Sequence, residues 1–271
     1  TSRGLGDVYK RQPNLSNNQF LLFLFGLFLI MAVWATATPM FAVPDEISHF
    51  VTAFGATNFQ FGSPVNLNGF YDWGFDCFAF QREVPASCYE MSWNSSITAM
   101  PVTTTGYLPT FFLVVSVPLH FFTGLESFTV ARAWITIVNF SVLALGFHYL
   151  FQSRLNRSSA LIALLILSPF PLYFMASINP SGLAYSLAFL LAVILLKGCS
   201  EPVARNWRLV TIFLTLAFLT VRRDSIVWVG VMGIAITPFP SVRNFLRGLP
   251  KRNGQRKQNS CLLYTSDAAD D

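Results

Sequence analysis

Residues 20–38 read FLLFLFGLFLIMAVWATAT, and this stretch decides the fold class because it holds no ionisable side chain. A helix needs about 20 consecutive apolar residues to cross the hydrocarbon core of a bilayer. Six further apolar runs follow it: Tyr107–Phe122, Ala133–Phe151, Ser159–Ile178, Gly182–Leu196, Leu209–Val221 and Ser225–Pro240. The pattern predicts an all-α fold, a polytopic transmembrane helical bundle.

The composition agrees with a membrane protein. The chain is 53% hydrophobic and 11% charged, whereas ordinary soluble domains carry about 25% charged residues. The net charge of +5 comes mostly from short loops between apolar runs and from the segment Arg243–Lys257. Lysine and arginine gather in this way on the cytoplasmic side, where they can contact anionic headgroups. We therefore expect membrane lipid as a partner and no nucleic acid.

The two ends of the chain differ from its interior in composition and periodicity. Residues 1–12 and 261–271 resemble translated sequencing-adapter sequence, and we set them aside as non-native. We expect a single transmembrane domain over residues 13–260, which is a fragment of a longer protein. Its expected location is a bacterial plasma membrane, crossed several times.

Residues 39–106 form one long hydrophilic loop, which is acidic except for Arg82. Loops poor in lysine and arginine lie outside the cell, so we place this loop there. It contains Cys77 and Cys88, a pair compatible with a disulfide in an oxidising compartment. Two free thiols are the alternative.

The run Tyr107–Phe122 sets the topology of everything after it. If every apolar run crosses once and the acidic loop is outside, the later basic loops also fall outside, against the positive-inside rule. Pro109 and Pro118 favour a broken or re-entrant segment, which is tolerated where it packs against protein. Such a segment gathers four polar residues on the side of Asp45: Arg132, Asn179, Arg222 and Arg223. A topology with the acidic loop inside also places the later basic loops in the cytoplasm, but it makes the cysteine pair harder to explain.

The stretch Pro44–Gly55 predicts a short helix at the start of this loop. Proline suits the first helical position, acids suit the first turn and glycine suits the end. Ile47, Phe50, Val51 and Phe54 recur at helical spacing and form one apolar stripe. The opposite face carries Asp45, His49 and Thr52, with Glu46 at its margin. We expect an amphipathic helix on the outer membrane surface, with its polar face toward water or a cavity.

Two interpretations of the acids in this helix stay open. In the first, Asp45 and Glu46 only complement the helix dipole, which contributes about 0.3–1 kcal/mol. In the second, Asp45 and His49, four residues apart on one face, bind a divalent metal ion or share a proton. A carboxylate near a low-dielectric surface serves as a general base once its pKa is raised.

The order of motifs along residues 15–245 resembles a family of uncharacterised bacterial integral membrane proteins related to the GT-C glycosyltransferases. A first span leads to Pro-Asp-Glu-x-x-His and a long outer loop, then to an apolar segment that opens with Tyr-Leu-Pro. The later motifs are Ala131-Arg132, the segment Ser177–Leu183 and Thr220–Arg223. The resemblance implies a GT-C-like bundle, a polyprenyl-phosphate-linked sugar as donor, and an acid of the first outer loop as catalytic base. Asp45 is then the first candidate and Glu46 the second.

The resemblance also suggests residues that bind the substrate. Arg132, Arg222 and Arg223 are candidates to hold the donor phosphate, because guanidinium matches phosphate geometry and ionised groups at membrane depth are often functional. Snorkelling of these arginines to headgroups is the alternative. Asn179 belongs either to a helix break that lines a cavity or to a simple turn. Such proteins often carry an acid after Asn-Pro, and here Ser181 stands in that place.

Taken with these residues, the resemblance implies an inverting glycosyl transfer, metal-assisted or metal-independent, to a cell-surface acceptor at the outer membrane face. A divalent ion near Asp45 and His49 is an optional cofactor. No nucleotide is expected, because the sequence has no phosphate-cradling glycine-rich motif. The alternative is a non-enzymatic transporter or scaffold for cell-surface polysaccharide assembly.

Overall fold

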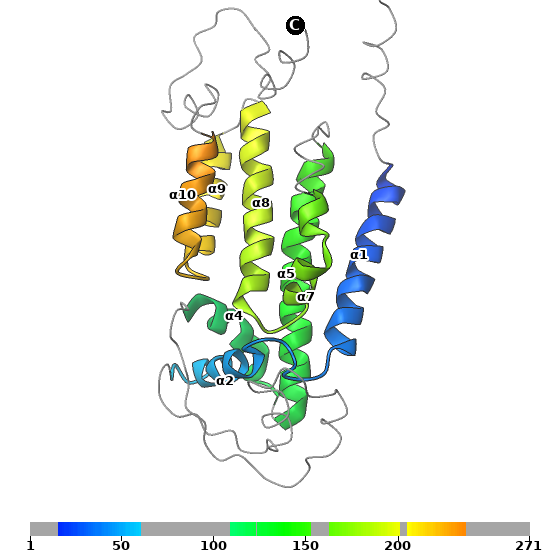
Figure 1. Ribbon diagram of the computed structural model, residues 1–271, viewed down its shortest axis with the longest axis vertical. Coiled ribbons are helices and arrows are strands. Elements are labelled where there is room, and N and C mark those ends of the chain that lie inside the picture. Colours follow the sequence, from blue (N-terminus) through cyan, green and yellow to red (C-terminus); the bar gives the residue numbers. More distant parts are fainter. Residues whose placement is uncertain (1–15, 61–108, 123, 153–162, 201–204, 237–271) are drawn as a thin grey trace, which may run out of the picture.

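The computed structural model describes residues 16–60, 109–122, 124–152, 163–200 and 205–236, and its regular elements there are helices (Figure 1). They are α1 (Asn17–Ala37), α2 (Glu46–Ala56), α4 (Pro109–Leu119), α5 (Gly124–Gln152), α7 (Pro169–Met175), α8 (Pro180–Ser200), α9 (Arg205–Leu219) and α10 (Ser225–Ile236). The predicted all-α bundle is confirmed. The predicted pair Cys77 and Cys88, the two chain ends and the segment Arg243–Lys257 lie outside the described residues.

Among the described residues, three helices are long and apolar enough to cross a membrane, which makes the chain a multi-pass membrane protein. The three spans are Asn17–Ala37, Glu126–Phe151 and Pro180–Gly198. Large apolar side chains of α1 are exposed, such as Leu22 at 69% and Phe25 at 58%. Such a surface suits contact with lipid chains, because leaving it in water is unfavourable.

The central contact of the bundle is between α5 and α8, which pack side by side. Phe147 of α5 and Phe189 of α8 place their ring centroids 4.8 Å apart. A Cβ atom at Gly146 would lie 2.5 Å from the Phe189 ring, so only glycine allows this approach. The same Phe147 ring also meets Phe23 of α1 edge to face at 5.0 Å, a favourable geometry for aromatic pairs.

The short helices α2 and α4 lie together at one end of the bundle (Figure 1). The 11 residues of α4 extend about 16 Å at 1.5 Å per residue, which is little more than half of the roughly 30 Å hydrocarbon core. That the segment is broken or re-entrant stays a prediction. Phe111 and Phe112 bury their rings where α4 meets α2.

Proline inside α4 explains one contact with α5. Pro118 has no N–H, so the carbonyl of Val114 loses its helical partner four residues later. The indole Nε1 of Trp134 on α5 donates to that carbonyl at 2.9 Å. The broken helix is therefore held by a side chain of its neighbour.

The described part of the predicted run Ser159–Ile178 is interrupted, because residues 163–166 are helical, residues 167 and 168 are not, and α7 begins at Pro169. α7 ends at Met175, and α8 begins at Pro180. A Cβ atom at Gly182 would lie 2.3 Å from the carbonyl oxygen of Phe174. The end of α7 therefore lies against the start of α8, and residues 176–179 between them are not part of either helix.

Candidate functional site

The predicted site begins with Asp45, which directly precedes α2. The helix starts at Glu46 rather than at Pro44, because Asp45 has φ 61° and lies in the left-handed region. Aspartate tolerates this conformation better than most residues. Its side chain makes no capping hydrogen bond, and it is exposed.

Glu46, one residue later, lies in the opposite environment. Its side chain is completely buried and forms an ion pair with Arg132 of α5. Arg132 donates from Nε to Oε1 at 3.1 Å and from Nη2 to Oε2 at 2.5 Å. The backbone N–H of Ile178 donates to Oε1 at 3.0 Å. Three segments distant in the sequence therefore meet at one carboxylate.

Arg132 also caps the end of α1. Its Nη1 donates to the carbonyls of Ala35 and Thr38 at 3.2 and 2.7 Å, and its Nη2 donates to Pro39 at 3.1 Å. A helix leaves its last carbonyls without partners and carries negative partial charge there. A guanidinium has five N–H donors, and these contacts with those to Glu46 use all of them. We therefore assign Arg132 to positioning, not to the phosphate role expected from the sequence.

Asn179 links the segment between α7 and α8 to the residues that precede α2. Its Nδ2 donates to the carbonyl of Pro44 at 3.1 Å, and its Oδ1 accepts from the backbone N–H of Ser181 at 2.9 Å. The second contact caps the first turn of α8. Of the two interpretations of Asn179, the geometry supports the turn, and that turn fixes the residue next to Asp45.

Arg222 lies in the turn between α9 and α10, beside the start of α8. Its Nη1 donates to the hydroxyl of Ser181, and its Nε donates to Oδ1 of Asp224 at 2.8 Å. The side chains of Arg222 and Asp224 are 28% and 53% exposed. Arg223 is exposed, and the turn between α9 and α10 lies toward the end of the bundle where α2 lies (Figure 1).

His49 corrects the predicted orientation of α2. His49 and Thr52 are buried, not turned toward water or a cavity. The imidazole packs against Phe111 and Phe112 of α4, with ring centroids 6.3 and 6.0 Å apart. Burial, followed by the positive charge of Arg222, lowers the pKa of His49 to about 3. The polar face of the helix is buried because α4 packs on it.

The predicted metal ligands, Asp45 and His49, differ in accessibility. Asp45 is exposed, whereas His49 is enclosed by aromatic rings. Within the described ranges, no group of three His, Cys, Asp or Glu side chains is arranged to hold a metal ion. The pair therefore offers one open carboxylate rather than a preformed set of ligands, and the metal stays a prediction.

Sequence reasoning missed a second polar contact, in the middle of the bundle. Asn139 of α5 donates from Nδ2 to the carbonyl of Met175 at 2.8 Å and accepts from the hydroxyl of Ser186 at 3.0 Å. It thereby satisfies a carbonyl at the end of α7. The sequence carried a signal for this contact, because an asparagine inside an apolar span requires a hydrogen-bond partner.

The chain belongs to a family of predicted membrane proteins, DUF2142, which matches residues 28–259. No curated protein and no solved structure matches the chain. The matched region contains α2 and every other residue placed in the site above.

Proposed function

We propose that this protein transfers a sugar from a polyprenyl-phosphate donor to a cell-surface acceptor, at the end of the bundle where α2 lies. The observation that carries the proposal is the difference in accessibility between the exposed Asp45 and the buried Glu46. Asp45 is an exposed acid on a constrained turn, and the neighbouring α9–α10 turn presents Arg222 and Arg223. The resemblance to GT-C enzymes supports the same assignment of roles.

Asp45 would act as the general base. It would take the proton of the acceptor hydroxyl while that oxygen attacks the anomeric carbon of the donor. The bond from that carbon to the phosphate oxygen breaks, the bonding pair leaves with the lipid phosphate, and the configuration inverts. General-base catalysis contributes typically 10²–10⁴-fold to rate.

Arg222 and Arg223 would stabilise the leaving phosphate. Arg222 lies close enough to His49 for its charge to affect that side chain, and His49 is one helical turn from Asp45. Preorganised cations at the developing charge lower the barrier without reorganisation. A divalent ion at Asp45 would supply the same charge, and loss of activity on adding a chelator would reveal it.

The other predicted site residues receive supporting roles. Glu46 is completely buried and accepts three hydrogen bonds, so an acceptor hydroxyl has less access to it than to Asp45. Together with Arg132 and Asn179, it fixes the backbone on either side of Asp45. We therefore assign these three residues to positioning.

The test compares Asp45→Asn with the wild type in liposomes supplied with polyprenyl-phosphate sugars. We expect at least a 100-fold loss of transfer with unchanged membrane insertion, because the exposed side chain supports no other contact of α2. Thr36→Ala, which changes an exposed side chain of α1, is the control and should keep full transfer. Full turnover by Asp45→Asn would refute the assignment.

A non-enzymatic scaffold is the second candidate. It is favoured by one observation: Glu46, Arg132 and Asn179 are engaged in contacts that stabilise the fold. A scaffold would support polysaccharide assembly in cells equally well with Asp45→Asn. Loss of assembly in that variant, at normal protein abundance, selects the enzyme.

A further inference from the structure

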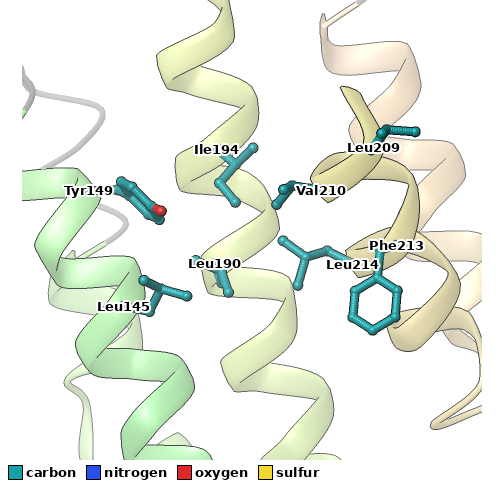
Figure 2. Close-up of a pocket in the computed structure, with 8 residues that line it drawn as sticks. All are labelled: Leu145, Tyr149, Leu190, Ile194, Leu209, Val210, Phe213 and Leu214. Carbon is teal, nitrogen blue, oxygen red and sulfur yellow. The ribbon is translucent and has the colours of Figure 1, made fainter. Parts of the chain in front are cut away.

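An apolar groove runs between α5, α8 and α9, and it is separate from the α2 site. Its volume is about 320 Å³, within the range of pockets that hold small ligands. Figure 2 shows how side chains from the three helices converge on it. The lining is Leu145, Tyr149, Leu190, Ile194, Leu209, Val210, Phe213 and Leu214.

Aromatic rings and a cation mark one end of this groove. Tyr149 of α5 meets Trp207 of α9 edge to face, with ring centroids 5.0 Å apart. Lys197 of α8 lies over both rings, its Nζ 5.4 Å from the Tyr149 centroid and 5.6 Å from the Trp207 centroid. Tryptophan, tyrosine and lysine are the residues that anchor helices at the level of lipid headgroups.

Figure 1 shows α2 at the opposite end of the bundle from the last turn of α8. Lys197 is in the last turn of α8, whereas Ser181, which contacts Arg222, is in the first turn of the same helix. The groove therefore opens toward the other face of the membrane from the proposed transfer site. The inference below does not rest on that proposed function.

We propose that the groove binds an anionic phospholipid of the surrounding bilayer. One acyl chain lies along the leucine and isoleucine side chains, and the headgroup phosphate lies at Lys197. The occupant follows from complementarity, since the walls are apolar along their length and a cation stands at the aromatic end. Basic pockets between transmembrane helices bind anionic headgroups in this way.

The charge and the groove make separate contributions, and variants can separate them. Lys197→Met keeps an apolar stem of similar length and removes the charge, whereas Lys197→Arg keeps the charge. Leu145→Trp directs extra volume into the groove from a residue that is 43% exposed, so it changes the core little. Leu22→Trp on the exposed face of α1 is its matched control.

The experiment measures bound lipid. The full chain is reconstituted with equal amounts of phosphatidylglycerol and phosphatidylcholine, extracted gently, and analysed by native mass spectrometry. We expect retained phosphatidylglycerol in the wild type, in Lys197→Arg and in Leu22→Trp. Lys197→Met should lower its retention about fivefold, since one basic residue near anionic lipid contributes about 1 kcal/mol. Leu145→Trp should abolish retention.

Three results would overturn the proposal. The first is equal retention of the two phospholipids by the wild type, or retention of neither, which would leave the groove without its stated occupant. The second is unchanged preference for phosphatidylglycerol in Lys197→Met. The third is the same retention in Leu145→Trp as in Leu22→Trp. Thermal unfolding of each variant checks that a loss of lipid does not come from a loss of fold.

Discussion

Asp45 and Glu46 are neighbours in the chain, yet they lie in opposite environments. Glu46 is buried, paired with Arg132 and bonded by the N–H of Ile178. Asp45 is exposed and makes no cap to the helix that it precedes. The backbone separates them, because the left-handed conformation of Asp45 turns the chain just before α2 begins.

The same contrast holds for the arginines. Arg132 has its whole donor set engaged by Glu46 and by carbonyls at the end of α1. Arg222 and Arg223 lie on a partly open turn. Charged residues near a membrane are therefore of two kinds here. Arg132 is buried in contacts between helices, whereas Arg222 and Arg223 are partly or fully accessible to solvent, and Arg222 also contacts Ser181 of α8.

The largest expected effect comes from breaking the buried pair. Arg132→Met leaves Glu46 buried without its partner, and removing one member of such a pair typically costs 3–5 kcal/mol. We expect a loss of that size in the free energy of unfolding, measured by denaturant titration in detergent micelles.

The double variant Arg132→Met with Glu46→Leu is the matched control. Replacing both members of a buried pair by apolar groups is often close to neutral, so it should recover part of the loss. Recovery stays incomplete because the carbonyls of Ala35, Thr38 and Pro39 also lose their donor. Wild-type stability in the single variant would show that the pair does not hold α2 in place.

The next effect concerns His49, the buried neighbour of the exposed site. Its pKa is about 3 in the folded chain against an ordinary 6.5, so the unfolded chain binds more protons between these values. The free energy of unfolding is therefore highest above pH 6.5, where His49 is neutral in both states, and it falls as the pH decreases below that value. We expect a loss of about 1.4 kcal/mol at pH 5.5 relative to neutral pH.

The measurement is the difference in pH dependence between the wild type and His49→Gln. Gln does not titrate, so the variant should lack this part of the slope whatever its stability at neutral pH. Identical slopes would mean that His49 is not buried in its neutral form. Carboxylates and the other histidines contribute equally to both curves, so they cancel.

A smaller effect is expected at the open turn. Arg222→Gln removes an ion pair whose acid, Asp224, is half exposed, and such surface pairs contribute about 0.2–1 kcal/mol. It also removes one of the two causes that lower the pKa of His49. We expect that pKa to rise in the variant, which NMR of the imidazole can follow. A stability loss as large as that of Arg132→Met would erase the distinction between the two arginines.

Sequence periodicity predicted the parts of this molecule that depend on local pattern. The uncharged stretch of α1 predicted a span, and the prolines of α4 predicted a segment too short to be an ordinary span. The charge balance of the later loops predicted that Arg132, Asn179 and Arg222 lie at one end, where they contact Glu46, Pro44 and Ser181. Periodicity placed His49 on a water-facing surface, because it cannot show that α4 folds back over that face. It also could not choose which acid pairs with Arg132, since 86 residues separate the partners.

The smallest expected effect on stability is at Asp45. A loss of activity in Asp45→Asn can therefore be distinguished from a loss of fold. Asn tolerates the left-handed conformation as Asp does, so Asp45→Asn should change the free energy of unfolding by less than about 0.5 kcal/mol. Asp45→Ala removes the same carboxylate but should cost about 1–2 kcal/mol more, because alanine is strained at φ 61°. Denaturant titration of both variants checks this order.

Transfer activity should depend on whether residue 45 carries a carboxylate, and not on how strained its backbone is. If Asp45 is the base, Asp45→Asn and Asp45→Ala lose transfer equally although their stabilities differ. Asp45→Glu carries the acid one methylene further, so it should retain a part of the activity that both other variants lack. If instead activity falls in the order of stability, with Asp45→Asn nearly normal, Asp45 serves only the turn, and the exposed acid has no catalytic part.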